Sequence, residues 1–275
     1  MKICLDAGHY KNYNQGVVKS YYEGNVVWKL TNLQKKYLEQ YKDVKVVLTR
    51  TDISKDLSLS DRGAKSKGCD LFLSNHSNYV DNSSVDRAVI IYPFDNKNKS
   101  DVLGKKLGAK IQEVMGLKQN YQMMTKKNNS GGEYYGVMRG ARAAGCPSYY
   151  ILEHGFHSHK NTCNWLLKDE NLDKLAKAEV EVIAKHYGLK KKTTSAPATS
   201  TSGKKVNYVV SIIADSLNVR KGAGTSFDIV EKDGKKLTLK KGEAYTIVEE
   251  KDGWGKLKSG AGWINVSSKY VTIKK

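Results

Sequence analysis

Residues 1–10 read MKICLDAGHY, and this stretch predicts a buried strand that ends just before a histidine. The apolar run Met1–Leu5 is bounded by Asp6-Ala7-Gly8, and His9 follows at the start of a polar loop. In an open α/β sheet, ligands bind outside the carboxyl ends of the strands. His9 is therefore a candidate for a functional residue at such an edge.

Short apolar runs alternate with helical patterns over the first 188 residues. The further runs are Val44–Leu48, Leu71–Leu73, Ala88–Tyr92 and Tyr149–Leu152. Between them, apolar residues recur every three or four positions, over residues 26–37, 102–114 and 180–187. This alternation predicts an α/β fold with a twisted, mostly parallel sheet flanked by helices.

The remainder of the chain has a different composition. Residues 189–205, LKKKTTSAPATSTSGKK, contain one large apolar residue and have the composition of a flexible basic linker. Residues 206–275 show short β-rich runs separated by glycine-containing turns, which is typical of a small all-β barrel. We therefore predict an α/β domain over 1–188, a linker over 189–205 and a β domain over 206–275.

The formal net charge of +19 over 275 residues indicates polyanionic partners, among which charge alone does not choose. The charge is spread over all three segments without a recognisable reading element, so we expect no nucleic-acid partner. No stretch approaches the roughly 18–20 apolar residues that span a bilayer, so we expect no membrane insertion. Because Asp6 interrupts the N-terminal apolar run, no secretory signal is evident, and we expect synthesis in the cytoplasm.

The cysteines offer neither a zinc motif nor a nucleophile. The four, Cys4, Cys69, Cys146 and Cys163, include no CxxC pair and are spread over a long chain. A disulfide framework or a cysteine-based zinc site is therefore disfavoured, and we expect all four to be packing residues.

Two histidines stand at predicted strand ends. His9 in ICLDAGHY and His76 in LFLSNHSN each follow an apolar strand and open a polar loop. They suggest a metal, and a catalytic zinc takes three protein ligands. Glu23, which opens the first predicted helix, is the natural third, although spacing alone slightly favours a helix-dipole or capping role for it. Glu153 follows the strand Tyr149–Leu152, where a carboxylate is costly unless it is paired or lies beside a metal.

The other histidines have more ordinary interpretations. His154 neighbours Glu153 but should point to the opposite side of the strand, as a structural residue or one that supports the site. His157 and His159 follow in a polar turn, and we expect them at the surface or on a rim. His186 lies near the end of the last helix of the α/β domain, where its charge favours the helix terminus.

Taken together and in order, these motifs resemble those of the zinc-dependent N-acetylmuramoyl-L-alanine amidases of bacterial cell walls and their phages. The matching stretches are DAGH, Glu23, LTRTD, LSLSDRGAKSKGCDLFLSNHSN and YYILEHGF, which span essentially all of 1–188. The resemblance implies that His9, Glu23 and His76 bind Zn²⁺ and that Glu153 is the catalytic carboxylate. Arg62 in LSLSDR falls on a further motif, where we expect a structural ion pair.

The C-terminal segment resembles bacterial Src-homology-3-like domains over about 208–273, through LNVRKGAGTSFDIV, DGWGKL and GWINVSSKYV. Trp254, Trp263 and Tyr270 are expected in the barrel core or at its edge. The resemblance implies a wall-binding domain for peptidoglycan and anionic wall polymers, joined to a hydrolase that cleaves the amide between N-acetylmuramic acid and L-alanine.

A phage endolysin, acting on the wall after release from the cytoplasm, fits these expectations best. A bacterial autolysin or mother-cell lytic amidase, a zinc peptidase acting within the stem peptide, and a non-catalytic wall-binding protein are the alternatives.

Overall fold

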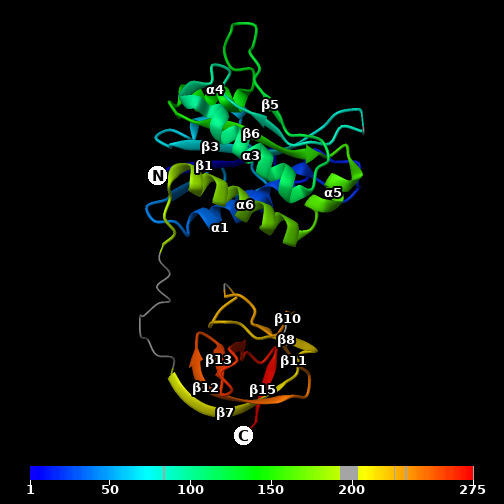
Figure 1. Ribbon diagram of the computed structural model, residues 1–275, viewed down its shortest axis with the longest axis vertical. Helices are drawn as coiled ribbons and strands as arrows, with labels where there is room; N and C mark the ends of the chain where they lie inside the picture. Colours follow the sequence, from blue (N-terminus) through cyan, green and yellow to red (C-terminus); the bar gives the residue numbers. More distant parts are fainter. Residues whose placement is uncertain (83, 193–203, 226, 233, 275) are drawn as a thin grey trace. The chain divides into compact units, whose positions relative to one another are not determined.

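The computed structural model describes residues 1–275 except 83, 193–203, 226, 233 and 275. The chain forms two compact units, Met1–Thr193 and Thr194–Lys275 (Figure 1). The linker predicted over 189–205 lies mostly outside the described residues. Among the helices that are described, none combines the length and the apolar character needed to cross a membrane.

The first unit is built on a six-stranded sheet with the order β2-β1-β3-β6-β4-β5. The strands are β1 (Lys2–Ala7), β2 (Lys45–Leu48), β3 (Leu71–Asn78), β4 (Val89–Ile91), β5 (Gln122–Met124) and β6 (Tyr149–Phe156). Neighbouring strands run parallel except β4 and β6, which are antiparallel. The mostly parallel sheet predicted from the sequence is thus confirmed.

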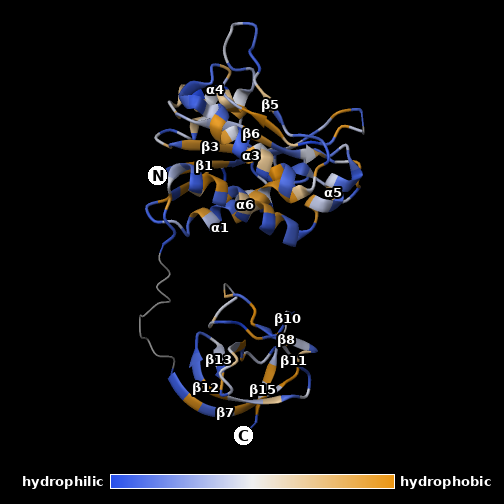
Figure 2. Ribbon diagram, in the orientation of Figure 1, coloured by the Kyte–Doolittle hydropathy of each residue, from blue (hydrophilic) through white to orange (hydrophobic). Residues whose placement is uncertain are grey.

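Helices cover both faces of this sheet (Figure 1). They are α1 (Glu23–Leu38), α2 (Leu59–Ala64), α3 (Ser100–Met115), α4 (Gly136–Ala143), α5 (Lys160–Leu166) and α6 (Asp169–Tyr187), with a short 3₁₀ helix at Lys97–Lys99. Strand side chains alternate between two cores. Ile3 and Leu5 pack under α1, α3 and α6, whereas Cys4 and Phe72 pack under α4, against which α2 lies. In Figure 2 the hydrophobic residues of this unit gather in the strands and alternate with hydrophilic residues along the helices.

The second unit is all-β and antiparallel. Its main sheet has the order β14-β13-β12-β7-β15, formed by β7 (Lys204–Ile212), β12 (Ala244–Lys251), β13 (Trp254–Leu257), β14 (Trp263–Asn265) and β15 (Val271–Lys274). Two short pairs complete it: β8 (Ser216–Asn218) with β11 (Thr238–Lys240), and β9 (Glu231–Lys232) with β10 (Lys235–Lys236). Trp254 is buried, while Trp263 and Tyr270 are half-buried.

The ends of β3 and β6 differ most from the sequence prediction. The apolar runs stop at Leu73 and Leu152, but β3 continues to Asn78 and β6 to Phe156. The prediction that His76 and Glu153 come after their strands is therefore wrong, since both lie inside them. The physical reason is that the backbone ladder between β3 and β6 continues through polar residues, and His76 and Glu153 are paired across it.

Candidate active site

The four residues proposed from the sequence meet at the carboxyl edge of the sheet. His9 follows β1 by two residues, with a backbone φ of 58°. His76 on β3 is the register partner of Glu153 on β6, and Glu23 is the first residue of α1. By strand alternation, His76 and Glu153 face the side of the sheet that α2 and α4 cover.

Three of these residues form a cluster that could hold a metal ion. One ligand atom from each of His9, Glu23 and His76 can be chosen so that all lie within 4.8 Å of one another. Nε2 of His9 lies 3.2 Å from Oε2 of Glu23, and Nδ1 of His76 lies 2.9 Å from Oε1. Two imidazoles and one carboxylate are a donor set of catalytic zinc sites. Of the described residues, no other group meets this test.

Glu23 is buried and contacts both histidines, so each of these groups affects the pKa of the others. Burial by itself raises the pKa of Glu23, but hydrogen bonds and charge from His76 and His9 lower it well below its usual range. Burial likewise lowers the pKa of His76, but the Glu23 carboxylate raises it to about 9. The carboxylate of Glu23 thus lies between the two imidazoles as an anion.

Glu23 does not act as a helix cap in the usual way. Its carboxylate accepts hydrogen bonds from the side-chain amide of Asn14 and from the backbone N–H of Ser77, at 3.0 Å in the second case. Asn14 belongs to the loop between His9 and α1, and the sequence analysis did not identify it. The alternative of a local capping role is disfavoured, because the carboxylate turns toward His9 and His76.

Glu153 lies beside this cluster with one oxygen unpaired. Oε2 is buried and has no hydrogen-bond partner among the described residues. Burial raises the pKa of Glu153 to about 7, an effect that the charge of His76 opposes and that of Glu23 reinforces. A carboxyl group in this condition is suited to accepting and returning a proton near neutral pH. Together with the donor set, the unpaired oxygen fits a site for a metal and a general base.

Glycines allow the segments of the site to approach closely. A Cβ placed on Gly8 would lie 2.3 Å from Cε1 of His76. One on Gly24 would lie 2.0 Å from the carbonyl oxygen of Tyr10. Neither approach leaves room for a side chain, so both the strand end and the start of α1 depend on glycine.

The expectation of a structural ion pair at Arg62 is confirmed. The buried guanidinium lies 3.4 Å from Asp6 and closer to Asp56. It also donates to the carbonyls of Ala7 and His9, at 2.7 and 2.9 Å. Arg62 therefore connects α2 to the backbone that carries His9.

His154 points away from the site, as expected from strand alternation. Its Nδ1 donates to the carbonyl of His76 at 2.9 Å, and its Nε2 lies 2.8 Å from the buried carboxylate of Glu179 on α6. Burial lowers the pKa of His154, but the charge of Glu179 outweighs it and raises the pKa above its usual value. Both ring nitrogens face acceptors, so the residue supports the strand from behind.

The expectation that His157 lies at the surface or on a rim is wrong. The side chain is fully buried, its Nδ1 donates to the carbonyl of Ser77 at 2.9 Å, and its ring stacks on Tyr21. The turn after β6 folds back over the sheet edge, and Tyr79 lies against the same ring. Its burial is set by residues distant in the sequence, which no local polarity pattern reveals.

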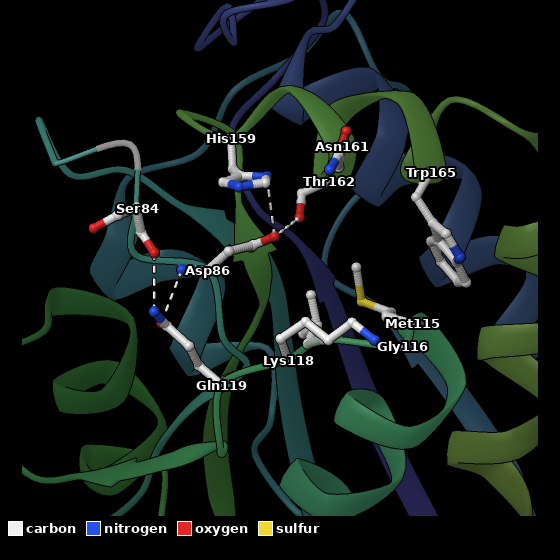
Figure 3. A pocket seen from close by; sticks show the side chains of 11 residues that line it. Ser84, Asp86, Met115, Gly116, Lys118, Gln119, His159, Asn161, Thr162 and Trp165 are labelled. Atoms are coloured by element: carbon white, nitrogen blue, oxygen red, sulfur yellow. Dashed lines mark hydrogen bonds and ion pairs between the residues drawn. The ribbon is translucent and has the colours of Figure 1, made fainter.

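His159 is partly exposed and lies on the rim of a separate cavity of about 250 Å³ beside α5 (Figure 3). Its Nδ1 is 3.3 Å from Asp86, which also accepts a hydrogen bond from Thr162. None of the four proposed site residues lines this cavity.

A second cavity, of about 520 Å³, opens directly onto the site. His9 and His76 line it, with Tyr10 and Tyr13 from the loop after β1 and Leu59 from α2. The ring of Tyr13 stacks on that of His9, with centroids 4.9 Å apart, and is about half exposed. The arrangement provides a partly aromatic groove for a substrate next to the candidate metal ligands.

The family whose sequence profile matches is described as N-acetylmuramoyl-L-alanine amidase, and the match covers residues 3–185. The chain belongs to this family. Residues 3–185 make up two thirds of the sequence, so this peptidoglycan amidase is a hydrolase whose catalytic domain is the first unit. No curated protein sequence matches the chain significantly.

Solved structures of several amidases share the fold of the first unit. The catalytic domain of CwlV from Bacillus (Paenibacillus) polymyxa var. colistinus is 20% identical, with a TM-score of 0.58 over 69% of this amidase and 99% of that chain. An amidase from Clostridium difficile 630 is also 20% identical, with a TM-score of 0.58 over 68% of this chain and 96% of that one. AmiC2 of Nostoc punctiforme is 19% identical, with a TM-score of 0.55 over 68% of this chain and 97% of that one. At these identities the similarity concerns the fold.

Proposed function

We propose that this amidase is zinc-dependent and cleaves the amide bond between the lactyl group of N-acetylmuramic acid and L-alanine of the stem peptide. The observation that carries the proposal is the convergence of His9, Glu23 and His76 next to the unpaired, buried oxygen of Glu153. A His₂Glu donor set with a neighbouring carboxylate suits hydrolysis of an unactivated amide.

His9, Glu23 and His76 would hold the zinc ion, which when bound supplies Lewis-acid polarisation of the scissile carbonyl and of a water molecule. Glu153 accepts the proton of the attacking water at its free carboxylate oxygen and returns it to the departing nitrogen of L-alanine. Asn14 and the N–H of Ser77 keep the Glu23 carboxylate oriented throughout. No protein nucleophile is required, and all four cysteines are buried free thiols, as expected from the sequence.

A digest of purified peptidoglycan tests the bond that is cut. Muramoyl amidase activity frees an amine on L-alanine and creates no new reducing sugar. After labelling of free amines and acid hydrolysis, labelled L-alanine alone should increase, EDTA should abolish the increase and zinc should restore it. Label on another stem or cross-bridge residue would identify a peptidase, and new reducing ends would identify a glycosidase. Wall binding without any release would favour the non-catalytic alternative.

The second unit is proposed to bind peptidoglycan and anionic wall polymers. Residues 206–275 carry 13 Lys and Arg against 8 Asp and Glu, which favours an anionic surface. The isolated segment should sediment with purified walls and be released by high salt. Sedimentation that is equally strong after removal of the anionic polymers would restrict the ligand to peptidoglycan itself.

We propose lysis of a phage-infected host as the setting, with the enzyme made in the cytoplasm and acting on the wall after release. Expression in a host cell should then cause lysis only when a second protein permeabilises the membrane. Lysis without such a protein would favour the alternative of a bacterial autolysin or mother-cell lytic amidase.

A further inference from the structure

Five of the six arginines of the chain are engaged by other groups of the protein. Arg50, Arg62, Arg139 and Arg220 donate to backbone carbonyls, and Arg142 pairs with Asp95. The sixth, Arg87, makes no hydrogen bond or ion pair with any described residue, and its Nε is buried without a partner. The side chain of Arg87 is half-buried, so its unpaired guanidinium is open to an acceptor outside the protein.

Arg87 stands just before β4, at the edge of the sheet where the catalytic residues gather. Because β4 runs antiparallel to β6, β4 begins at the edge where β6 ends, and its first residue Val89 is the register partner of Glu153. Arg87 precedes Val89 by two residues. At about 3.3 Å per residue, its Cα therefore lies roughly 7 Å beyond the position opposite Glu153.

The alternation of side chains around β4 assigns Arg87 to the catalytic face. Val85, Val89 and Ile91 pack into the core under α4, on the face toward which Glu153 is directed. Ala88 and Ile90 pack into the opposite core. Positions 85, 89 and 91 thus share one face, and continuing the alternation back from the start of β4 assigns Arg87 to the same face.

The contacts of Asp86, the residue before Arg87, agree with this assignment of faces. Figure 3 shows Asp86 turned toward His159 and Thr162 on the α5 side, where its carboxylate accepts a hydrogen bond from the hydroxyl of Thr162. Its other oxygen accepts the backbone N–H of Phe156 at 3.1 Å, which attaches this segment to the end of β6. The backbone at Asp86 and Arg87 is therefore held next to the end of β6, and strand alternation assigns the two side chains to opposite faces.

We propose that Arg87 binds a carboxylate of the substrate, namely the free α-carboxylate of the stem-peptide residue that follows L-alanine. This rests on the proposed function. An extended peptide advances about 3.3–3.6 Å per residue, so the residue after L-alanine begins one such step from the scissile nitrogen, a distance that the long side chain of an arginine at this edge of the sheet can span. The planar guanidinium pairs with a carboxylate through two parallel hydrogen bonds, which a carboxamide cannot reproduce.

The test uses the full chain and two soluble muramoyl peptides that differ only in whether this carboxyl group is free or amidated. The wild-type enzyme should show a KM about 10- to 100-fold lower for the free carboxylate, the range expected for a charged hydrogen-bonded pair. Arg87→Gln should raise the KM for the free carboxylate to that for the amide, with kcat nearly unchanged. Arg87→Lys should restore only part of the preference, since an ammonium group is a point charge.

The control variant is Lys67→Gln, which removes one exposed positive charge before β3, at the opposite edge of the sheet. It should leave the preference between the two peptides intact. Zinc content and melting temperature should be the same in the wild type, Arg87→Gln and the control. Equal values exclude misfolding as the cause of the higher KM of Arg87→Gln.

The outcomes separate the two proposals. If the wild-type enzyme frees no alanine amine from either peptide, the proposed function is wrong and this inference falls with it. If the wild-type enzyme is active but does not distinguish the peptides, or if Arg87→Gln keeps the wild-type preference, only the assignment of Arg87 is overturned. A loss of kcat on both peptides at constant KM would also overturn it, because it would place the guanidinium at the reacting atoms.

Discussion

The buried contact between Glu179 and His154 links α6 to the strand behind the active site, and its loss should destabilise the catalytic unit. Both side chains are almost completely buried. The carboxylate of Glu179 accepts from His154 at 2.8 Å and from the side-chain amide of Gln34 at 2.9 Å. Glu179→Ala removes the acceptor of both groups at once, which leaves Nε2 of His154 unpaired and Gln34 with only its hydrogen bonds to Asn75.

Removing one partner of a buried ion pair costs about 3–5 kcal/mol, because the remaining group keeps its desolvation penalty. For a domain of 150–250 residues, 1 kcal/mol corresponds to a shift of about 2–4 °C in the melting temperature. The first unit falls in this size range. We therefore expect Glu179→Ala to lower the melting temperature of this unit by roughly 6–20 °C. Replacing both His154 and Glu179 by leucine should cost less than the single change, since no unpaired charge is then buried.

Differential scanning calorimetry of the full chain measures this shift. The second unit has its own hydrophobic core and should unfold in a separate transition, which serves as an internal reference. Only the transition of the first unit should move. A shift of less than about 2 °C in Glu179→Ala, or a double leucine variant that is less stable than the single variant, would refute the reasoning that an uncompensated buried charge dominates.

Four further predictions follow from the site and its surroundings. His76→Ala should abolish the binding of about one zinc ion per chain, whereas Glu153→Gln should keep the metal and lose turnover; metal analysis that shows the reverse would exchange their roles. Gly8→Ala should weaken zinc binding by about 10- to 100-fold in a titration with a competing chelator, because its Cβ would displace the His76 ring; unchanged affinity would show that the ring can move freely. Gly63→Ala should lower the melting temperature of the first unit, because its Cβ would lie 2.1 Å from the carbonyl oxygen of Val137, and an unchanged value would mean that α2 separates from α4 without cost. Clearing of whole walls should fall with rising salt more steeply than cleavage of soluble muramoyl peptides, and equal salt dependence would argue against electrostatic wall binding.

The positions of His9 and Glu23 could be predicted because the signals that reveal them are local. An apolar run followed by Asp6-Ala7-Gly8 marks the end of a strand, which β1 reaches at Ala7, and the helical period that starts after Glu23 marks the beginning of a helix. Strand–helix alternation likewise predicts a parallel sheet, because consecutive parallel strands need a crossover between them. The all-β character of the second unit could be predicted as well, because short β-rich runs and glycine-containing turns are also local signals. These inferences depend on periodicity and sequence order alone.

The features that the sequence analysis missed depend on which segments meet in space. The antiparallel placement of β4 beside β6 puts Arg87 two residues before Val89, the register partner of Glu153, which the sequence alone does not reveal. The burial of His157 comes from Tyr21 and Tyr79, which lie far from it in the sequence.

The sequence by itself therefore determined the elements, their class and the residue types able to hold a metal. Only the tertiary structure decided that Asn14 binds the Glu23 carboxylate, that His157 is buried and that Arg87 has no partner among the described residues. The physical reason is that hydrophobic periodicity encodes one buried face of each element, whereas a polar side chain finds its partner only after distant elements have packed together.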